Sequence, residues 1–223
     1  MLHRTNDFAT SLGLSADDRR RVEALATKAA EAANGMTHLE DYRALGAVCA
    51  DLRPRRIFEI GTFLGITSNY FLDLLPEAEV VSIAYCRNRL NPFAKKYNNS
   101  SMNSGDVGSK VTAANRTRFH QLLGDSHALT ATEMLREFGP FDLVFIDGDH
   151  SRLGVSQDTT LAQAILAPNG AICWHDANPA EKYQDVREFL EKDLPYAALA
   201  TPDRYIGGVA YWHQSLTERG VLP

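Results

Sequence analysis

The sequence predicts an α/β protein built on a parallel sheet. Short runs rich in β-branched and aromatic residues alternate along the chain with longer segments of helical periodicity, which is the pattern of consecutive strand–helix–strand units. No internal repeat interrupts this alternation. Motifs rich in glycine, aspartate and histidine follow several of the predicted strands, at the sheet edge where proteins of this class bind their ligands.

The composition restricts the function classes that fit the chain. Its 223 residues are 44% hydrophobic and 23% charged, which suits one globular domain with a sizeable core. A formal net charge of -5 argues against a general nucleic-acid binder, which needs a basic face, and favours a small-molecule partner. The apolar stretches are far shorter than the roughly 20 residues of a membrane span, and no secretory signal opens the chain. We therefore expect a cytoplasmic protein.

The first predicted elements are two helices and a buried strand. Ser15 is a helix N-cap, and apolar residues at helical spacing follow it. A second helix is predicted over Leu39 to Leu52, and residues 56–60 have the apolar pattern of a buried strand. Residues 1–53 are expected to form an N-terminal helical segment that packs on the same domain as residues 54–223.

The next unit contains a glycine turn, a helix and a second strand. Ile66 begins a helical face that ends at Pro76, and residues 79–84 form the following strand. Residues 88–116 are rich in Asn, Ser and Lys and show little periodicity, at a length where loops are usually functional. We expect a lid or an insertion there.

The alternation of strands and helices resumes after this segment. The predicted elements are a strand at Arg118–Leu123, a helix at about Ala128–Phe138, a strand at Phe141–Ile146, a helix at about Val155–Ala167, a turn at Pro168–Gly170, a strand at Ala171–Trp174 and a helix beginning near Tyr183. Two short strands, Tyr196 to Ala200 and Val209 to Trp212, are then expected to pair as an antiparallel C-terminal hairpin.

The turn after the first strand reads Glu-Ile-Gly-Thr-Phe-Leu-Gly at residues 59–65. Gly61 and Gly65 allow a sharp turn and a close approach of the backbone to a ligand. The spacing lacks the additional glycine with which a dinucleotide pyrophosphate is placed on a helix N-terminus, so it favours a ligand without phosphate. An ordinary turn between strand and helix is the alternative.

A carboxylate and a hydroxyl follow the strand at residues 118–123. Asp125 and Ser126 lie at the predicted carboxyl edge of the sheet, where they could accept hydrogen bonds from an adenine amino group. Asp and Ser also favour helix N-caps, so they could instead cap the next helix. Both roles can coexist.

Two further strands end in aspartate and histidine. Asp147 and His150 follow the strand at 141–146, and His175 and Asp176 follow the strand that ends at Trp174. Adjacent parallel strands would place these four side chains in one crevice. The carboxylates could hold Mg²⁺, whereas the histidines would also suit Mn, Fe or Zn. Such a metal acidifies a substrate hydroxyl, and a free histidine could take its proton as general base.

Together these motifs resemble class I S-adenosylmethionine-dependent methyltransferases, most closely the branch with the cephalosporin-type and macrolide O-methyltransferases. The resemblance rests on residues 58–65, 141–150 and 166–176, and it spans about Arg55 to Trp212. It implies a Rossmann-like, seven-stranded, mostly parallel sheet with helices on both faces and a methyl-transfer reaction with S-adenosylmethionine as cofactor.

The resemblance also implies roles for individual residues. Asp147 and Asp176 match metal-ligand positions of the metal-dependent O-methyltransferases, and His175 falls where that branch places another acidic ligand. Catalytic roles are expected for Asp147, His150 and His175. Cofactor contacts are implied for Glu59, Gly61, Thr62, Gly65, Asp125, Ser126 and Asp147.

One position departs from the family. Members usually end the second strand with an acid that accepts hydrogen bonds from the ribose of the cofactor, whereas this chain has Ala84 followed by Tyr85. Loss of that acceptor is expected to weaken cofactor binding by about a few kcal/mol unless Tyr85, a lid residue or water replaces it.

The leading hypothesis is O-methylation of a small hydroxylated molecule with help from a metal or a histidine. The sulfonium of the cofactor is already a leaving group, so catalysis requires alignment and deprotonation of the acceptor. Ala84 and His175 motivate an alternative, a non-catalytic binding or partner subunit of the same fold. A metal-dependent hydrolase is a third alternative, and the sequence leaves open whether the chain forms a homo-oligomer.

Overall fold

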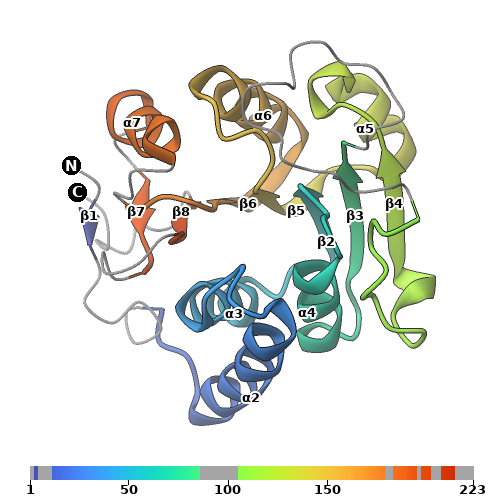
Figure 1. The fold of residues 1–223 in the computed structure, drawn as a ribbon, viewed down its shortest axis with the longest axis vertical. Helices are drawn as coiled ribbons and strands as arrows, with labels where there is room; N and C mark the ends of the chain where they lie inside the picture. The colour runs from blue at the N-terminus through green and yellow to red at the C-terminus, as the bar shows by residue number, and fades with distance from the viewer. Residues whose placement is uncertain are drawn as a thin grey trace.

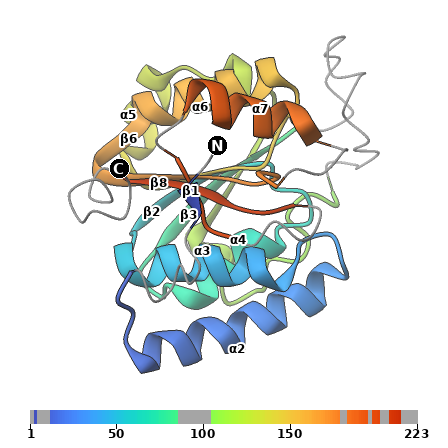
Figure 2. The ribbon, with the colours of Figure 1, turned by 90° about the vertical axis from the view of Figure 1, so that its left-hand side faces the viewer.

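The computed structural model describes residues 3–4, 12–85, 105–178, 183–194, 197–201 and 207–213. They form one twisted sheet with helices packed on both of its faces (Figures 1 and 2). One face is covered by α3 (Leu39–Leu52) and α4 (Ile66–Leu74), on whose outer side α2 (Ala16–Ala33) packs, and the other by α5 (Ala131–Phe138), α6 (Arg152–Ile165) and α7 (Gln184–Asp193). The expected α/β fold with helices on both faces is confirmed.

The described residues form a sheet of eight strands in the order β1-β7-β8-β6-β5-β2-β3-β4. The strands are β1 (His3–Arg4), β2 (Arg56–Ile60), β3 (Glu79–Ala84), β4 (Phe119–Leu123), β5 (Phe141–Ile146), β6 (Leu166–Trp174), β7 (Ala198–Leu199) and β8 (Ala210–His213). β8 runs antiparallel to β6 and β7, and the other neighbouring pairs are parallel. The mostly parallel sheet and the C-terminal hairpin are therefore confirmed.

The expected number of seven strands is wrong. Among the described residues, six strands contain four residues or more, and β1 and β7 contain two each. β1 is the addition, and it pairs in parallel with β7 at the edge of the sheet. A strand of two polar residues has no hydrophobic periodicity, so the sequence pattern does not reveal it.

The helix after β5 and the strand after it begin earlier than expected. α6 starts at Arg152, with Ser151 as its N-cap, and ends at Ile165. The segment Pro168–Gly170, expected as a turn before the strand, lies within β6. It sits at an irregularity where the register with β5 shifts, and Asn169 has a φ of 62°. Pro, Asn and Gly mark this bulge as readily as they mark a turn, because both need unusual backbone angles.

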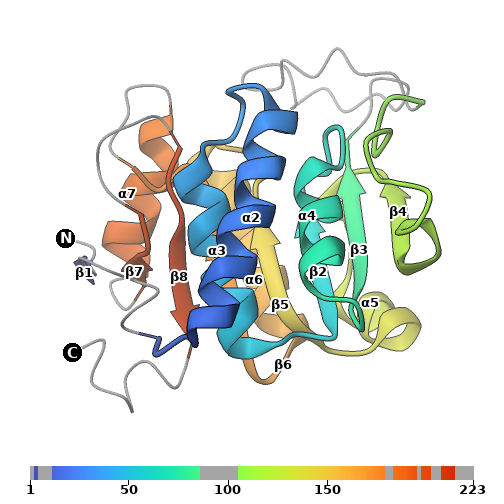
Figure 3. The same cartoon turned by 90° about the horizontal axis from the view of Figure 1, so that it is seen from below.

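The helices on the first face include both predicted N-terminal helices. α3 has the predicted bounds, and the Ser15 side chain caps α2 by accepting from the Asp18 backbone N–H. Figure 3 looks onto this side of the molecule, and Figure 2 shows that α2 packs on the outer side of α3 and α4. In the described part of the chain, no helix combines the length and hydrophobicity needed to cross a membrane.

Part of the expected lid or insertion packs against the glycine turn. Residues 88–104 lie outside the described residues, whereas 105–116 form turns beside α4. The Gly108 N–H donates to the Phe63 carbonyl and the Lys110 N–H donates to the Leu64 carbonyl, each at 2.9 Å. These residues therefore cover one side of the turn that follows β2.

Candidate functional site

The turn after β2 is fixed between two neighbouring strands. The backbone N–H groups of Gly61 and Thr62 both donate to the Ile83 carbonyl, at 2.9 and 3.2 Å. Gly61 has a φ of 108°, and a Cβ there would lie 2.0 Å from the Asp147 carbonyl oxygen. Glycine is required because the backbone angle is left-handed and the end of β5 occupies the space of a side chain.

The second predicted glycine contacts protein rather than an open site. Gly65 is the N-cap of α4, and a Cβ there would meet Val111 and Gly108 at 2.8 and 2.9 Å. Its absent side chain therefore makes room for the segment at 105–116. A direct contact of Gly65 with the cofactor stays a prediction.

A pocket opens on the outer side of the glycine turn, next to the ends of α2 and α3. Three predicted site residues line it, Gly61, Thr62 and Asp147. The other residues that line it are Ala33, Met36, Thr37, Tyr42, Phe63, Leu64, Ile66 and Thr67. Apolar walls with a few polar groups are typical of small-molecule sites. The chemistry of this lining fits one end of an amphipathic cofactor.

Glu59 lies beneath the turn instead of lining the pocket. Its side chain is 1% exposed and accepts hydrogen bonds from the hydroxyls of Ser68 and Ser82. Burial raises the pKa of Glu59 to about 7, and the nearby charge of Asp147 acts in the same direction. The observed role is support of the turn from below, and a direct cofactor contact stays a prediction.

Asp125 and Ser126 follow β4 at the same edge of the sheet. Asp125 accepts from the backbone N–H of His127 at 3.0 Å and so caps a 3-10 turn at Ser126–Ala128. α5 begins later than expected, at Ala131, with Thr130 as its N-cap. Capping by Asp125 is thus confirmed for a short turn, and the adenine contact stays a prediction.

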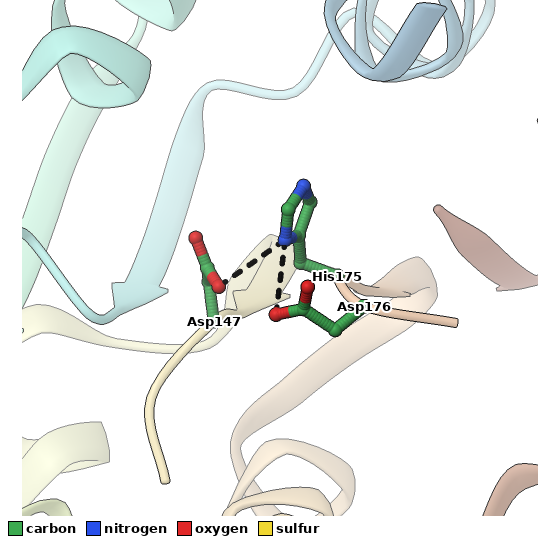
Figure 4. Close-up of side chains that lie close together, drawn as sticks. All are labelled: Asp147, His175 and Asp176. Atoms are coloured by element: carbon green, nitrogen blue, oxygen red, sulfur yellow. Dashed lines mark ion pairs between the residues drawn. The ribbon is translucent and has the colours of Figure 1, made fainter. Parts of the chain in front are cut away.

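The two aspartates and two histidines of the predicted crevice lie close together in the structure. β5 and β6 are parallel neighbours with Ile146 opposite Trp174, so the residues that follow them emerge side by side. His175 Nδ1 lies 3.4 Å from Asp147 Oδ1 and 3.2 Å from Asp176 Oδ2, as Figure 4 shows. Strand order therefore creates the cluster that the sequence motifs predicted.

His150 approaches the same two carboxylates. Its Nε2 lies 2.7 Å from Asp176 Oδ2 and 3.6 Å from Asp147 Oδ1. The ring stacks on Tyr183, with the centroids 4.1 Å apart. Burial acts to lower the pKa of His150, but the two carboxylates outweigh it and raise the pKa to about 10.

The buried charges shift the other members of the cluster as well. Burial acts to lower the pKa of His175, but the charges of Asp147 and Asp176 hold it well above the usual value. Burial acts to raise the pKa values of Asp147 and Asp176, but the neighbouring His175 and His150 hold both below the usual value. Without a metal, these shifts favour the charged forms of both histidines and of both aspartates at neutral pH.

We expect the metal-free protein to lose stability as the pH rises from about 7 towards 10. The folded pKa of His150, about 10, is above the unfolded value. Its contribution is therefore complete below an unfolded pKa of about 6.5 and disappears through the folded pKa, an effect of about 2–5 kcal/mol. Urea unfolding with a chelator at several pH values measures it. His150→Gln is expected to flatten the slope, and an equally steep slope in both proteins would contradict the prediction.

Sequence reasoning missed one residue of the cluster, Asp41 of α3. The side chain is completely buried, and its Oδ2 lies 3.3 Å from His175 Nε2. The one local signal is an acid near the start of a predicted helix, which accepts from the His38 backbone N–H. That signal indicates a helix cap. It says nothing of a contact with a residue 134 positions away.

The donor atoms of the cluster fit a divalent cation. Asp147, His175 and Asp176 each offer one ligand atom, and these atoms lie within 4.8 Å of one another. The buried His175 Nδ1 points into this group without a hydrogen-bond partner among the described residues. Two carboxylate oxygens and one imidazole nitrogen form a donor set that several divalent metals accept. These residues could therefore hold a metal.

The chain matches one family model, described as a methyltransferase domain, over residues 58–177, which is more than half of its length. This match covers the glycine turn, Asp125, Ser126 and the whole aspartate–histidine cluster except Asp41. No curated protein sequence matches the chain.

Solved structures with a similar fold include several methyltransferases. The O-methyltransferase TomG from Streptomyces achromogenes, involved in tomaymycin synthesis and bound to SAM, is 20% identical with a TM-score of 0.53, over 85% of this chain and 89% of that chain. An O-methyltransferase from Bacillus cereus with SAH is 17% identical with a TM-score of 0.54, over 86% and 90%. The mycinamycin-pathway methyltransferase MycE, with Mg, SAH and mycinamycin VI, is 16% identical with a TM-score of 0.56, over 85% and 53%.

Proposed function

Because the chain belongs to the methyltransferase domain family, we propose that it transfers the methyl group of S-adenosylmethionine to a hydroxyl group of a small molecule. One observation carries this proposal: Asp147 both lines the pocket beside the glycine turn and belongs to the aspartate–histidine cluster. A donor in the pocket would therefore lie next to the groups that can prepare an acceptor. The adenosyl ligands of structures with a similar fold support the identity of the donor.

The proposed cofactor site follows the carboxyl edge of the sheet. Gly61, Thr62 and Asp147 would hold one end of the cofactor in the pocket, and Asp125 and Ser126 would contact the adenine beyond the ends of β3 and β4. β3 ends at the buried Ala84, which offers no side-chain acceptor to the ribose. We propose that the half-buried Tyr85 or an ordered water takes that place.

The proposed chemistry is deprotonation and alignment of the acceptor hydroxyl. Asp147, His175 and Asp176 would hold a divalent cation, which lowers the pKa of a bound hydroxyl when present. His150 is oriented by Asp176 and by its stacking on Tyr183. Because Nε2 faces the Asp176 carboxylate at 2.7 Å, the other ring nitrogen, Nδ1, is the atom at which it would accept the proton. For this role His150 must be neutral, and a cation that offsets the two carboxylates would favour its neutral form.

Calorimetric titration with S-adenosylhomocysteine, followed by a methyl-transfer assay, tests the proposal. We expect saturable binding, and release of S-adenosylhomocysteine with at least one member of a panel of phenols, sugars and macrolide-type alcohols when Mg²⁺ or Mn²⁺ is present. A reaction without acceptor is the control. No binding by the folded protein at millimolar ligand would overturn the proposal. Binding without transfer to any acceptor would favour the non-catalytic alternative.

A further inference from the structure

Asp41 lies behind His175, on the side of the ring away from the other two aspartates. His175 Nε2 lies 3.3 Å from Asp41 Oδ2, whereas Nδ1 lies 3.2 Å from Asp176 and 3.4 Å from Asp147. Figure 4 shows the second ring nitrogen of His175 directed away from the two carboxylates that are drawn. The ring is thus held between one carboxylate at Nε2 and two at Nδ1.

Asp41 is itself held in place by backbone donors. Its Oδ1 accepts from the Gly208 N–H at 3.0 Å, and its Oδ2 accepts from the His38 N–H at 3.1 Å. These donors come from the start of α3 and from the segment before β8, so the carboxylate is connected to two separate parts of the fold. A hydrogen bond from Nε2 to Asp41 would keep the ring proton on Nε2, so that Nδ1 could give its lone pair to a metal bound between Asp147 and Asp176.

The distances from His175 Nδ1 to the two carboxylates suit a small divalent ion. Ligand atoms at about 2.1 Å from a metal are about 3.0 Å apart in an octahedral arrangement and about 3.4 Å apart in a tetrahedral one. The distances from His175 Nδ1 to Asp176 and Asp147, 3.2 and 3.4 Å, agree with this range. The Nδ1 atom, on a histidine that is 7% exposed, points into the same space and forms ion pairs with both carboxylates but no hydrogen bond.

We propose that Asp41 is a positioning residue that fixes His175 as a nitrogen ligand, so that the site selects a first-row transition-metal ion over Mg²⁺. The inference rests on the metal-assisted form of the proposed function. Imidazole nitrogen favours ions such as Mn²⁺, Co²⁺ or Zn²⁺, whereas Mg²⁺ prefers oxygen ligands alone. An outer carboxylate that accepts from the remote ring N–H fixes the orientation of the histidine and raises its basicity as a ligand.

Metal titrations of the purified full chain test the inference. We expect Co²⁺ and Mn²⁺ to bind at least about tenfold more tightly than Mg²⁺, and Asp41→Asn to weaken Co²⁺ binding about 10–100-fold. Asp142→Asn is a matched control, because the Asp142 carboxylate also accepts from two backbone N–H groups, those of Arg55 and Arg56, at the other end of β2. It should leave Co²⁺ affinity unchanged within about twofold.

Testing Asp41→Asn in a His175→Ala variant separates a positioning role of Asp41 from a general structural role. If Asp41 acts through the ring, Asp41→Asn should change Co²⁺ affinity less than about twofold once His175→Ala is present. Equal losses in both backgrounds would overturn the positioning role. His175→Asn tests the nitrogen ligand even if the Asp41 variant does not fold, and it should abolish the preference for Co²⁺ over Mg²⁺.

The relative affinity of the unaltered protein for Co²⁺ and Mg²⁺ tests the proposed metal selectivity directly. Equal affinity for Mg²⁺ and Co²⁺ would overturn the proposed selectivity. Binding of S-adenosylhomocysteine is measured on the same samples without added metal. Absence of cofactor binding would overturn the proposed function even if the metal preference is observed. Cofactor binding without the metal preference would overturn only the further inference.

Discussion

Replacing Gly61 by alanine is expected to abolish cofactor binding. The residue has a φ of 108°, and the new Cβ would lie 2.0 Å from the Asp147 carbonyl oxygen. Non-bonded carbon atoms are normally about 3.5 Å or more from their neighbours, so the turn or the end of β5 must move by more than 1 Å. Either movement distorts the pocket at Gly61 and Asp147, and we expect affinity for S-adenosylhomocysteine to fall by about 100-fold or more.

Calorimetry with S-adenosylhomocysteine measures this loss, and thermal unfolding reports the accompanying strain. Gly105→Ala is the matched control, because a Cβ at Gly105 meets nothing within 4 Å. The control should bind the cofactor as the unaltered protein does. If Gly61→Ala binds within about twofold of the unaltered protein, the pocket beside the turn is not the cofactor site.

The substitution Asp176→Asn is expected to leave cofactor binding intact and to remove most of the turnover. Asp176 does not line the pocket, but its Oδ2 lies between His150 Nε2 and His175 Nδ1. Asparagine keeps the shape and removes the charge, so both the binding of a metal and the orientation of His150 are weakened. We expect turnover to fall by about 10²–10⁴-fold, the usual contribution of a positioned proton acceptor.

Steady-state kinetics and cofactor titration on the same preparation check this expectation. Asp142→Asn again serves as the control, because this carboxylate caps the start of β2 at the opposite end of the sheet. Unchanged turnover in Asp176→Asn would remove Asp176 from the mechanism. A parallel loss of cofactor affinity would instead indicate that the substitution disturbs the pocket.

The match to the methyltransferase domain family confirms the family that the sequence motifs indicated. The family could be predicted because each of these motifs is a short, continuous segment of the chain. Gly61 is needed where a buried strand must turn sharply. Asp147 directly follows β5, and His175 and Asp176 directly follow the buried, mostly apolar end of β6. The segment Pro168–Gly170 is predicted as a turn because its residues favour turns. Only its pairing with β5 shows that it is a bulge within a strand.

The α/β class, the order of the main elements and four of the five members of the aspartate–histidine cluster could be predicted from the sequence. Periodicity locates strands, and parallel strands deliver the residues after them to one edge of the sheet. Two positions can be seen only in the folded structure: Glu59 lies beneath the turn, and Asp41 lies against His175. Both are interactions between side chains of separate elements, and their geometry depends on how α3 and α4 pack on the sheet. No pattern along the chain encodes that packing, because it arises from many contacts made together.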